Sequence, residues 1–210
     1  MKKLLLIHCM LFALNLFPQS SKDILLERDH EQLIERLKFM DYLNDVTMKL
    51  EGHIRRGGGD LEIPFYSYYN DSIVAPNPYP STNISSYLDY QLNEVPPTAA
   101  DFIVRVYNRN ALNLHTIIKR YGYPTTTKLD KYVKINPFRA TFIIQKASDD
   151  WKKIFYPLIK EENRKGNLTE IEYTFCRLAF KNGIMTQSEA HEFTAIMKRH
   201  GYSPAKRFDY

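Results

Sequence analysis

Apolar residues recur at helical spacing through the first part of the chain. Between Lys22 and Arg56 they stand three, four or seven positions apart, and charged residues fill the positions between them. Three consecutive glycines at 57–59 follow, and glycine is costly inside a helix because it loses much backbone entropy there. The pattern predicts one long amphipathic helix over 22–56. Its apolar stripe consists of Leu26, Leu33, Leu37, Met40, Leu43 and Leu50.

A second stripe begins at Thr98 and predicts a helix that ends before Gly122. Tyr123 and Pro124 follow, and this Gly-apolar-Pro order is typical of a helix C-terminus. Residues 196–203 repeat the octet at 117–124 almost unchanged, with Gly201 in the place of Gly122. We interpret the repeat as two helix stops of the same kind. The stripe itself consists of Ile103, Val106, Asn110, Leu114, Ile117 and Tyr121.

Further helices are expected between these two stops. Asn136 can cap one that has Pro137 in its first turn. Asp149 or Asp150 can cap the next, and Pro157 should bend or interrupt that helix because proline lacks the N–H that a helix needs.

Two more helix starts follow towards the C-terminus. Asn167 or Thr169 can begin one helix, which should end at Gly183. Residues 186–189 read TQSE, a capping box that predicts the start of the last helix. Together the patterns predict an all-α fold: a single domain of about five to six helices, interrupted by one irregular insertion.

The insertion covers residues 61–97 and is rich in proline and tyrosine. Prolines at this density exclude long regular helices. Tyrosine offers a large, rigid contact area with one polar tip, so we identify these side chains as the candidate ligand-binding residues. The alternative is that most of them pack onto the helices and anchor the insertion. They are Tyr66, Tyr68, Tyr69, Tyr79, Tyr87 and Tyr90.

The N-terminus has the order of a secretory signal peptide. Lys2 and Lys3 precede an apolar run over 4–17, and Pro18 and small residues follow. A membrane anchor is the alternative, but this run of about 14 residues is shorter than the roughly 20 that span a bilayer. The sequence therefore predicts a signal peptide over 1–20, a single helical domain over 21–210, and an exported protein that is periplasmic or extracellular.

The net charge and the cysteine content limit the classes of function that the sequence supports. The formal net charge is +5, and it falls to +3 when Lys2 and Lys3 leave with the signal. This is too mild for nucleic-acid binding, which needs a clustered basic face. Cys176 stands in an apolar helical segment and is predicted to be a buried, unreactive thiol. No zinc-binding spacing is present, so we expect no metal or other cofactor. We also expect no transmembrane span in the mature chain.

Short motifs at 122–124, 145–147 and 156–158 stand in an order that resembles an uncharacterised bacterial family, a domain of unknown function. The family's Gly-aromatic-Pro turn matches Gly122-Tyr123-Pro124, and its Leu-Pro-Leu helix matches 156–158. Its Gln-His-Ala segment matches 145–147, with Lys146 in place of the histidine, and its Tyr-Gly-Thr-Gln stretch is absent. The resemblance covers roughly 33–45 and 107–183. It implies a helical fold and brings no activity.

These observations favour an exported, non-enzymatic binding or interaction protein. Its partner is an unidentified protein, peptide or glycan, contacted through the tyrosine-rich insertion. One alternative is a cell-envelope hydrolase whose site is assembled around His115 and a distant carboxylate. A second is a purely structural helper. The N-glycosylation pattern occurs three times and matters only in a eukaryotic secretory pathway. It stands at Asn70-Asp71-Ser72, Asn83-Ile84-Ser85 and Asn167-Leu168-Thr169.

Overall fold

The computed structural model describes residues 21–56, 98–133 and 139–201. Within these ranges it contains seven α-helices and no strand, which confirms the all-α prediction. The predicted signal peptide, the Tyr/Pro-rich insertion and the expected helix start at Asn136 lie outside the described residues. The helices are α2 (Ser21–Arg56), α5 (Ala99–Tyr121), α6 (Thr126–Leu129), α7 (Arg139–Lys146), α8 (Asp149–Arg164), α9 (Glu170–Phe180) and α10 (Gln187–Arg199).

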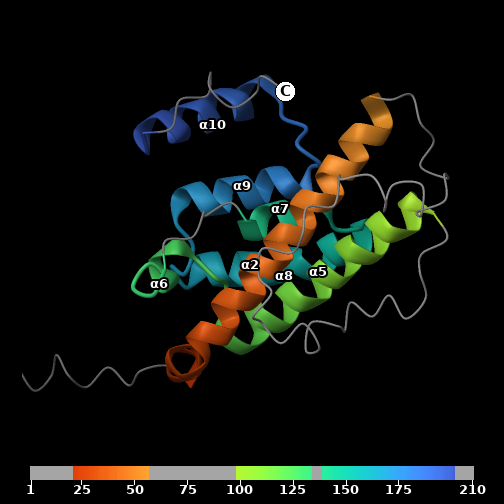
Figure 1. Ribbon diagram of the computed structural model, residues 1–210. Helices are drawn as coiled ribbons and strands as arrows, with labels where there is room; N and C mark the ends of the chain where they lie inside the picture. The colour runs from red at the N-terminus through yellow and green to blue at the C-terminus, as the bar shows by residue number, and fades with distance from the viewer. Residues whose placement is uncertain (1–20, 57–97, 134–138, 202–210) are drawn as a thin grey trace, which may run out of the picture.

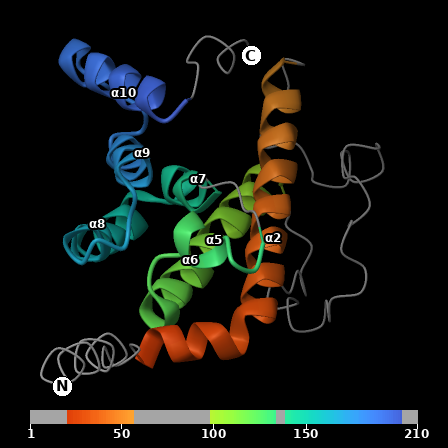
Figure 2. The same cartoon turned by 90° about the vertical axis from the view of Figure 1, so that its left-hand side faces the viewer.

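The two longest helices, α2 and α5, lie against each other, and α7 contacts α2, α5, α8 and α9 from a central position (Figures 1 and 2). The predicted stripes form their contact. Met40, Leu50, Leu114 and Ile117 are almost completely inaccessible to solvent. Asn110 lies on the stripe of α5 and is also buried; its Nδ2 donates to the Met40 carbonyl at 3.1 Å. This bond offsets the cost of burying an amide.

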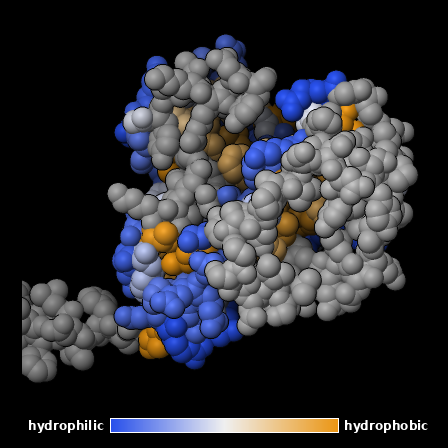
Figure 3. Space-filling view, viewed as in Figure 1, coloured by the Kyte–Doolittle hydropathy of each residue, from blue (hydrophilic) through white to orange (hydrophobic). Residues whose placement is uncertain are grey.

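The first turns of α2 run at a steep angle to the rest of the helix and cross the end of α5 (Figure 2). Asp29 accepts hydrogen bonds there from Arg120 Nη2 at 2.9 Å and from Tyr121 Oη at 2.8 Å. The neighbouring Arg28 guanidinium and the Tyr121 hydroxyl hold the pKa of Asp29 well below its usual range. Hydrophilic residues gather over this end of α2 (Figure 3). The contacts therefore fasten the ends of two helices at the surface.

Helix starts follow the capping signals with one correction. Thr169 caps α9 and Thr186 caps α10, each in a complete capping box. The N-cap of α8 is Ser148 rather than Asp149 or Asp150. The two aspartates lie in the first turn of α8, where a carboxylate interacts favourably with the positive end of the helix dipole.

Pro157 lies inside α8, and the helix continues through it from Asp149 to Arg164. Of the predicted bend or interruption, the interruption is therefore wrong. Pro157 and Lys153, whose carbonyl loses its helical partner, are both exposed, so water can bond to that carbonyl. On the opposite face Phe155 and Ile159 are fully buried. Burial of two such side chains contributes about 1.5–3 kcal/mol each and outweighs the local cost.

The turn from α5 to α6 is held by two carboxylates from distant helices. Gly122 has φ +78°, in the left-handed region that favours glycine. The next residue, Tyr123, is fully buried, and its backbone N–H donates to Glu162 Oε2 at 3.0 Å. The Thr126 N–H begins α6 and donates to Glu172 Oε1 at 3.1 Å. Both glutamates are themselves buried.

The repeated octet marks a helix end at both places, as predicted. Gly122 has φ +78° and Gly201 has φ +77°. The surroundings differ, however. A Cβ added at Gly122 would lie 2.7 Å from Lys128 Nζ and 3.0 Å from Glu162 Oε2, whereas a Cβ at Gly201 meets nothing within 4 Å. The first copy is a packed turn and the second is an exposed stop.

The last helix, α10, packs against α9. Phe193, Ile196 and Met197 of α10 form an apolar cluster with Ile171 of α9. This cluster shares no residue with the main core, which joins α2, α5, α7, α8 and α9. In both views α10 lies at the outer side of α9 (Figures 1 and 2).

Candidate functional site

A groove of about 720 Å³ lies between α8 and α9 and opens to solvent. This volume is within the range of roughly 300–1,000 Å³ that ligand pockets usually have. Positively charged and aromatic side chains dominate the groove, with a single acidic residue. The lining residues are Asp149, Lys152, Lys153, Tyr156, Tyr173, Arg177, Phe180 and Lys181.

Helical spacing brings these side chains together. The lining positions are 149, 152, 153 and 156 on α8, and 173, 177 and 180 on α9 with its C-cap at 181. Residues three, four or seven positions apart share one face of a helix. Because α8 and α9 pack against each other, their two faces meet along the groove.

Aromatic rings form one part of the groove wall. Tyr156 and Phe180 meet edge to face, with ring centroids 5.4 Å apart. Tyr173 and Phe180 are partly buried against the main core, which fixes their position, while Tyr156 is 48% exposed. Lys160 Nζ lies 4.8 Å from the centroid of the Tyr156 ring. The wall therefore offers fixed ring surface to an incoming apolar or planar group.

Two lysines of α8 add positive charge. The Lys152 side chain is only 12% exposed, and its Nζ donates to Asn182 Oδ1. Its nearest carboxylate, that of Asp149, is 3.9 Å away and 83% exposed. Lys153 Nζ donates to Asp150 Oδ1 at 2.9 Å, and this bond raises the pKa of Lys153. Lys152 is thus a cation whose charge is only weakly neutralised.

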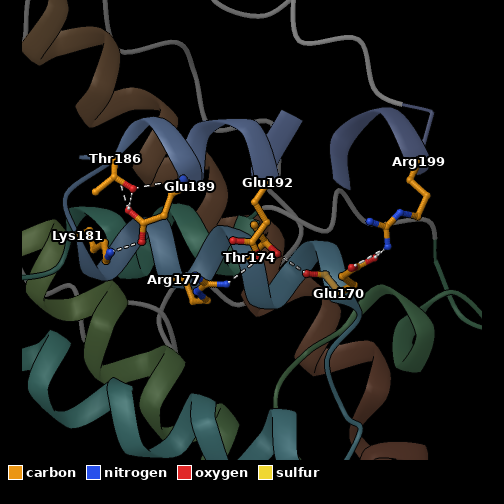
Figure 4. A network of polar contacts seen from close by, with 8 residues as sticks. All are labelled: Glu170, Thr174, Arg177, Lys181, Thr186, Glu189, Glu192 and Arg199. Atoms are coloured by element: carbon orange, nitrogen blue, oxygen red, sulfur yellow. Dashed lines mark hydrogen bonds and ion pairs between the residues drawn. The ribbon is translucent and has the colours of Figure 1, made fainter. Parts of the chain in front are cut away.

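The cations of α9 also hold α10. Arg177 Nη1 donates to Glu192 Oε1 at 3.3 Å, and Lys181 Nζ donates to Glu189 (Figure 4). The Lys181 ammonium and the Thr186 N–H and hydroxyl lower the pKa of Glu189 to about 2. Arg177 and Lys181 also line a small cavity of about 10 Å³ between α9 and α10. Arg177 and Lys181 therefore lie between the groove and α10.

This arrangement is suited to recognition. Guanidinium and ammonium groups donate hydrogen bonds to an anion, and the rings beside them accept an apolar or planar group. None of the lining residues is a serine, cysteine or histidine, so the lining contains no nucleophile paired with an imidazole base.

His115 lies apart from the groove. Its ring is half-buried and packs at a tilt on Trp151, with centroids 5.9 Å apart. Burial and the nearby Lys119 ammonium lower the pKa of His115. A carboxylate partner would raise this pKa, as in a catalytic pair. The two residues that the structure places around His115, Trp151 and Lys119, thus do not provide such a pair.

Other predicted residues are placed as follows. The six tyrosines of the insertion lie outside the described residues, so their role stays a prediction. Cys176 is fully buried as a free thiol, which confirms the predicted burial. Burial raises its pKa to about 12, which supports the prediction that it is unreactive. The glycosylation pattern at Asn167 is engaged in the fold: its Nδ2 donates to Glu162 Oε2 at 3.0 Å, and the Thr169 hydroxyl donates to Glu172 at 2.7 Å.

Lys146, which stands where the resembled family has histidine, joins the far ends of α2 and α5. Its Nζ donates to Glu51 Oε2 at 3.1 Å and lies 5.6 Å from the centroid of the Tyr107 ring. Arg55 Nη2 donates to Glu51 Oε1 at 3.0 Å. Burial raises the pKa of Glu51, but the bonds from Lys146 and Arg55 outweigh it and leave the pKa below its usual value. The Glu51 carboxylate is paired with both Lys146 and Arg55, so we assign this cluster a structural role.

Comparison with protein-family models, curated proteins and solved structures gave no match. The resemblance to a bacterial family therefore stays a prediction. Among the helices that the structure describes, none combines the length and the apolar character that a membrane span needs. No three histidine, cysteine or acidic side chains gather as a metal site in the same ranges.

Proposed function

We propose that this chain is an exported, non-enzymatic binding protein and that the groove between α8 and α9 is its contact surface. The observation that supports this most directly is the groove itself: four cations and three rings face a common space of about 720 Å³. Export rests on the basic and apolar N-terminal pattern of residues 1–20.

Three side chains of the groove are already ordered before binding. Tyr173 and Phe180 are held against the core, and the nearly buried Lys152 is held by Asn182. Binding costs less when the contact side chains are already ordered, because less rotamer entropy is lost. Tyrosine and arginine are enriched at recognition sites, and the groove contains Tyr156, Tyr173 and Arg177.

The test is a binding screen with paired variants. The wild-type protein and the double variant Tyr156→Ala/Arg177→Ala are applied to one array of synthetic peptides and oligosaccharides. The matched control is Arg164→Ala, which removes an exposed arginine of α8 that pairs with Glu161 away from the groove. We expect signals that the control keeps and the double variant loses. An array without signal, or signals that the double variant retains, contradicts the proposal.

Export has its own test. The full chain is expressed in a bacterium, and the intact mass of the protein is measured in the periplasmic and cytoplasmic fractions. We expect the periplasmic form to begin between residues 18 and 22. An unprocessed protein in the cytoplasmic fraction contradicts export. That result does not affect the proposal that the groove binds a ligand.

A further inference from the structure

We infer that the groove takes an extended acidic peptide whose carboxylates compete with Glu189 and Glu192 of α10 for Arg177 and Lys181. The inference rests on the proposed binding function. It adds the chemical class of the ligand and a link between the ligand and α10.

The first step is the shared position of the two cations. Arg177 and Lys181 line both the groove and the small cavity beneath α10. Arg177 is bonded to Glu192 and Lys181 to Glu189, across the contact between α9 and α10 (Figure 4). Arg177 and Lys181 are 42% and 50% exposed, so both remain within reach of a solute. Each can turn towards α10 or towards the groove.

The second step is spacing. Arg177 lies in α9, and Lys181 is the C-cap that follows its last residue. Four residues separate them, so their backbones are about 6 Å apart along the helix axis. Alternate side chains of an extended peptide point to the same side and are separated by about 6.6–6.8 Å. A Glu-x-Glu sequence therefore presents its two carboxylates in register with the two cations. The side chain between them lies next to the Tyr156 and Phe180 rings, which meet across the groove with centroids 5.4 Å apart.

The third step is the choice of a peptide over a nucleic acid. Duplex DNA carries about one charge per 1.7 Å, so it needs a continuous basic track. Here Asp150, Glu189 and Glu192 stand beside the cations and interrupt any such track. Carboxylates spaced along a peptide can meet the cations individually, and aromatic side chains between them can meet the Tyr156 and Phe180 rings.

The competition makes binding and α10 docking interdependent. A peptide that binds Arg177 or Lys181 removes ion pairs that hold α10, and by linkage a weakened α10 contact favours the peptide. The apolar cluster around Phe193 keeps α10 in place, so the peptide loosens α10 without detaching it. Exposed ion pairs change an equilibrium by roughly two- to fivefold, which sets the size of the expected effects.

The experiment uses the full chain and an alternating glutamate–tyrosine peptide labelled with a fluorophore, with affinity measured by anisotropy. Glutamine–tyrosine and glutamate–serine peptides test charge and ring separately, and an oligogalacturonate tests acidic glycans. Three variants are compared with wild type, and the first, Arg177→Gln, removes a cation of the groove. Glu192→Gln frees Arg177, and Glu161→Gln adds the same charge on α8, where Glu161 pairs with Arg164 and lies outside the groove. Hydrogen exchange of the α10 amides is followed with and without peptide.

We expect the glutamate–tyrosine peptide to bind, each control peptide to bind more weakly, and Arg177→Gln to weaken binding. Glu192→Gln should tighten it roughly two- to fivefold while Glu161→Gln leaves it unchanged, and the peptide should speed exchange in α10. The competition hypothesis is overturned if binding depends on Arg177 but not on Glu192 and the exchange of the α10 amides is unchanged. That result leaves the proposed binding function intact. Binding of oligogalacturonate alone overturns the peptide class. No binding of any probe, together with a silent array, overturns both proposals.

Discussion

Glu172 gives a direct test of what holds this fold together. Its side chain is fully buried and accepts hydrogen bonds from the backbone N–H groups of Thr126 at 3.1 Å and Thr169 at 2.9 Å, and from the Thr169 hydroxyl at 2.7 Å. Alanine leaves both partly buried N–H groups without their acceptor, at about 1–2 kcal/mol each. We therefore expect Glu172→Ala to lower the free energy of unfolding by about 2–4 kcal/mol, a large share of the 5–15 kcal/mol typical of a domain.

The assay is urea denaturation followed by far-UV circular dichroism, with the m-value compared between variants. The chain contains its own control, because Thr186 and Glu189 form the same capping box at the exposed start of α10. Glu189 lies on the surface and reaches no second helix start, so Glu189→Ala should cost clearly less than Glu172→Ala. Equal losses from the two variants would refute the reasoning that burial and the bond to α6 make Glu172 important.

Three further outcomes are expected. Gly122→Ala should lower the free energy of unfolding by about 1–3 kcal/mol in urea denaturation, because φ is +78° and charged atoms lie 2.7 and 3.0 Å from the new Cβ. Gly201→Ala, with similar φ and open space, should lose less. The pKa of Glu189 stands at about 2 because Lys181 bonds to it, below roughly 4.3 for an unfolded chain. Its stabilising contribution is complete above about pH 4.3 and is lost as the pH falls towards 2. Exchange of α10 amides, corrected for intrinsic pH dependence, should rise in that window, and Glu189→Gln should flatten the rise. Cys176, whose burial raises its pKa to about 12, should react with a thiol reagent only as fast as the protein unfolds, and rapid labelling of the native state contradicts this.

The helices could be predicted because their signals are local. Apolar stripes, Thr98, Thr186 and glycine stops act within a few residues, and the observed bounds of α2, Ser21–Arg56, differ from the predicted 22–56 by one residue. The short helix α6 was not predicted. Thr125 caps it locally by accepting from the Lys128 N–H, but four residues are too few to show an apolar period. Its first N–H also donates to Glu172, which stands 46 residues away from Thr126. No pattern within a short window carries such a contact.

The groove was missed for a related reason. The density of tyrosines at 61–97 favours the insertion as the binding segment, while Asp149 and Pro157 carry only signals for helix starts and bends. A signal was present: cationic and aromatic residues share one face on each of two successive helices. This signal does not define a site from the sequence alone. The faces of α8 and α9 that meet are set by the packing of both helices against the core.

The separate apolar cluster beneath α10 has a consequence for how the molecule comes apart. Cooperative units that share few contacts can open independently, at a free energy below that of global unfolding. Release of α10 would uncover Ile171 and Phe193 while the main core remained intact. Within the described residues, we therefore expect proteolysis and aggregation to begin from a species in which α10 is released and the other helices are still native.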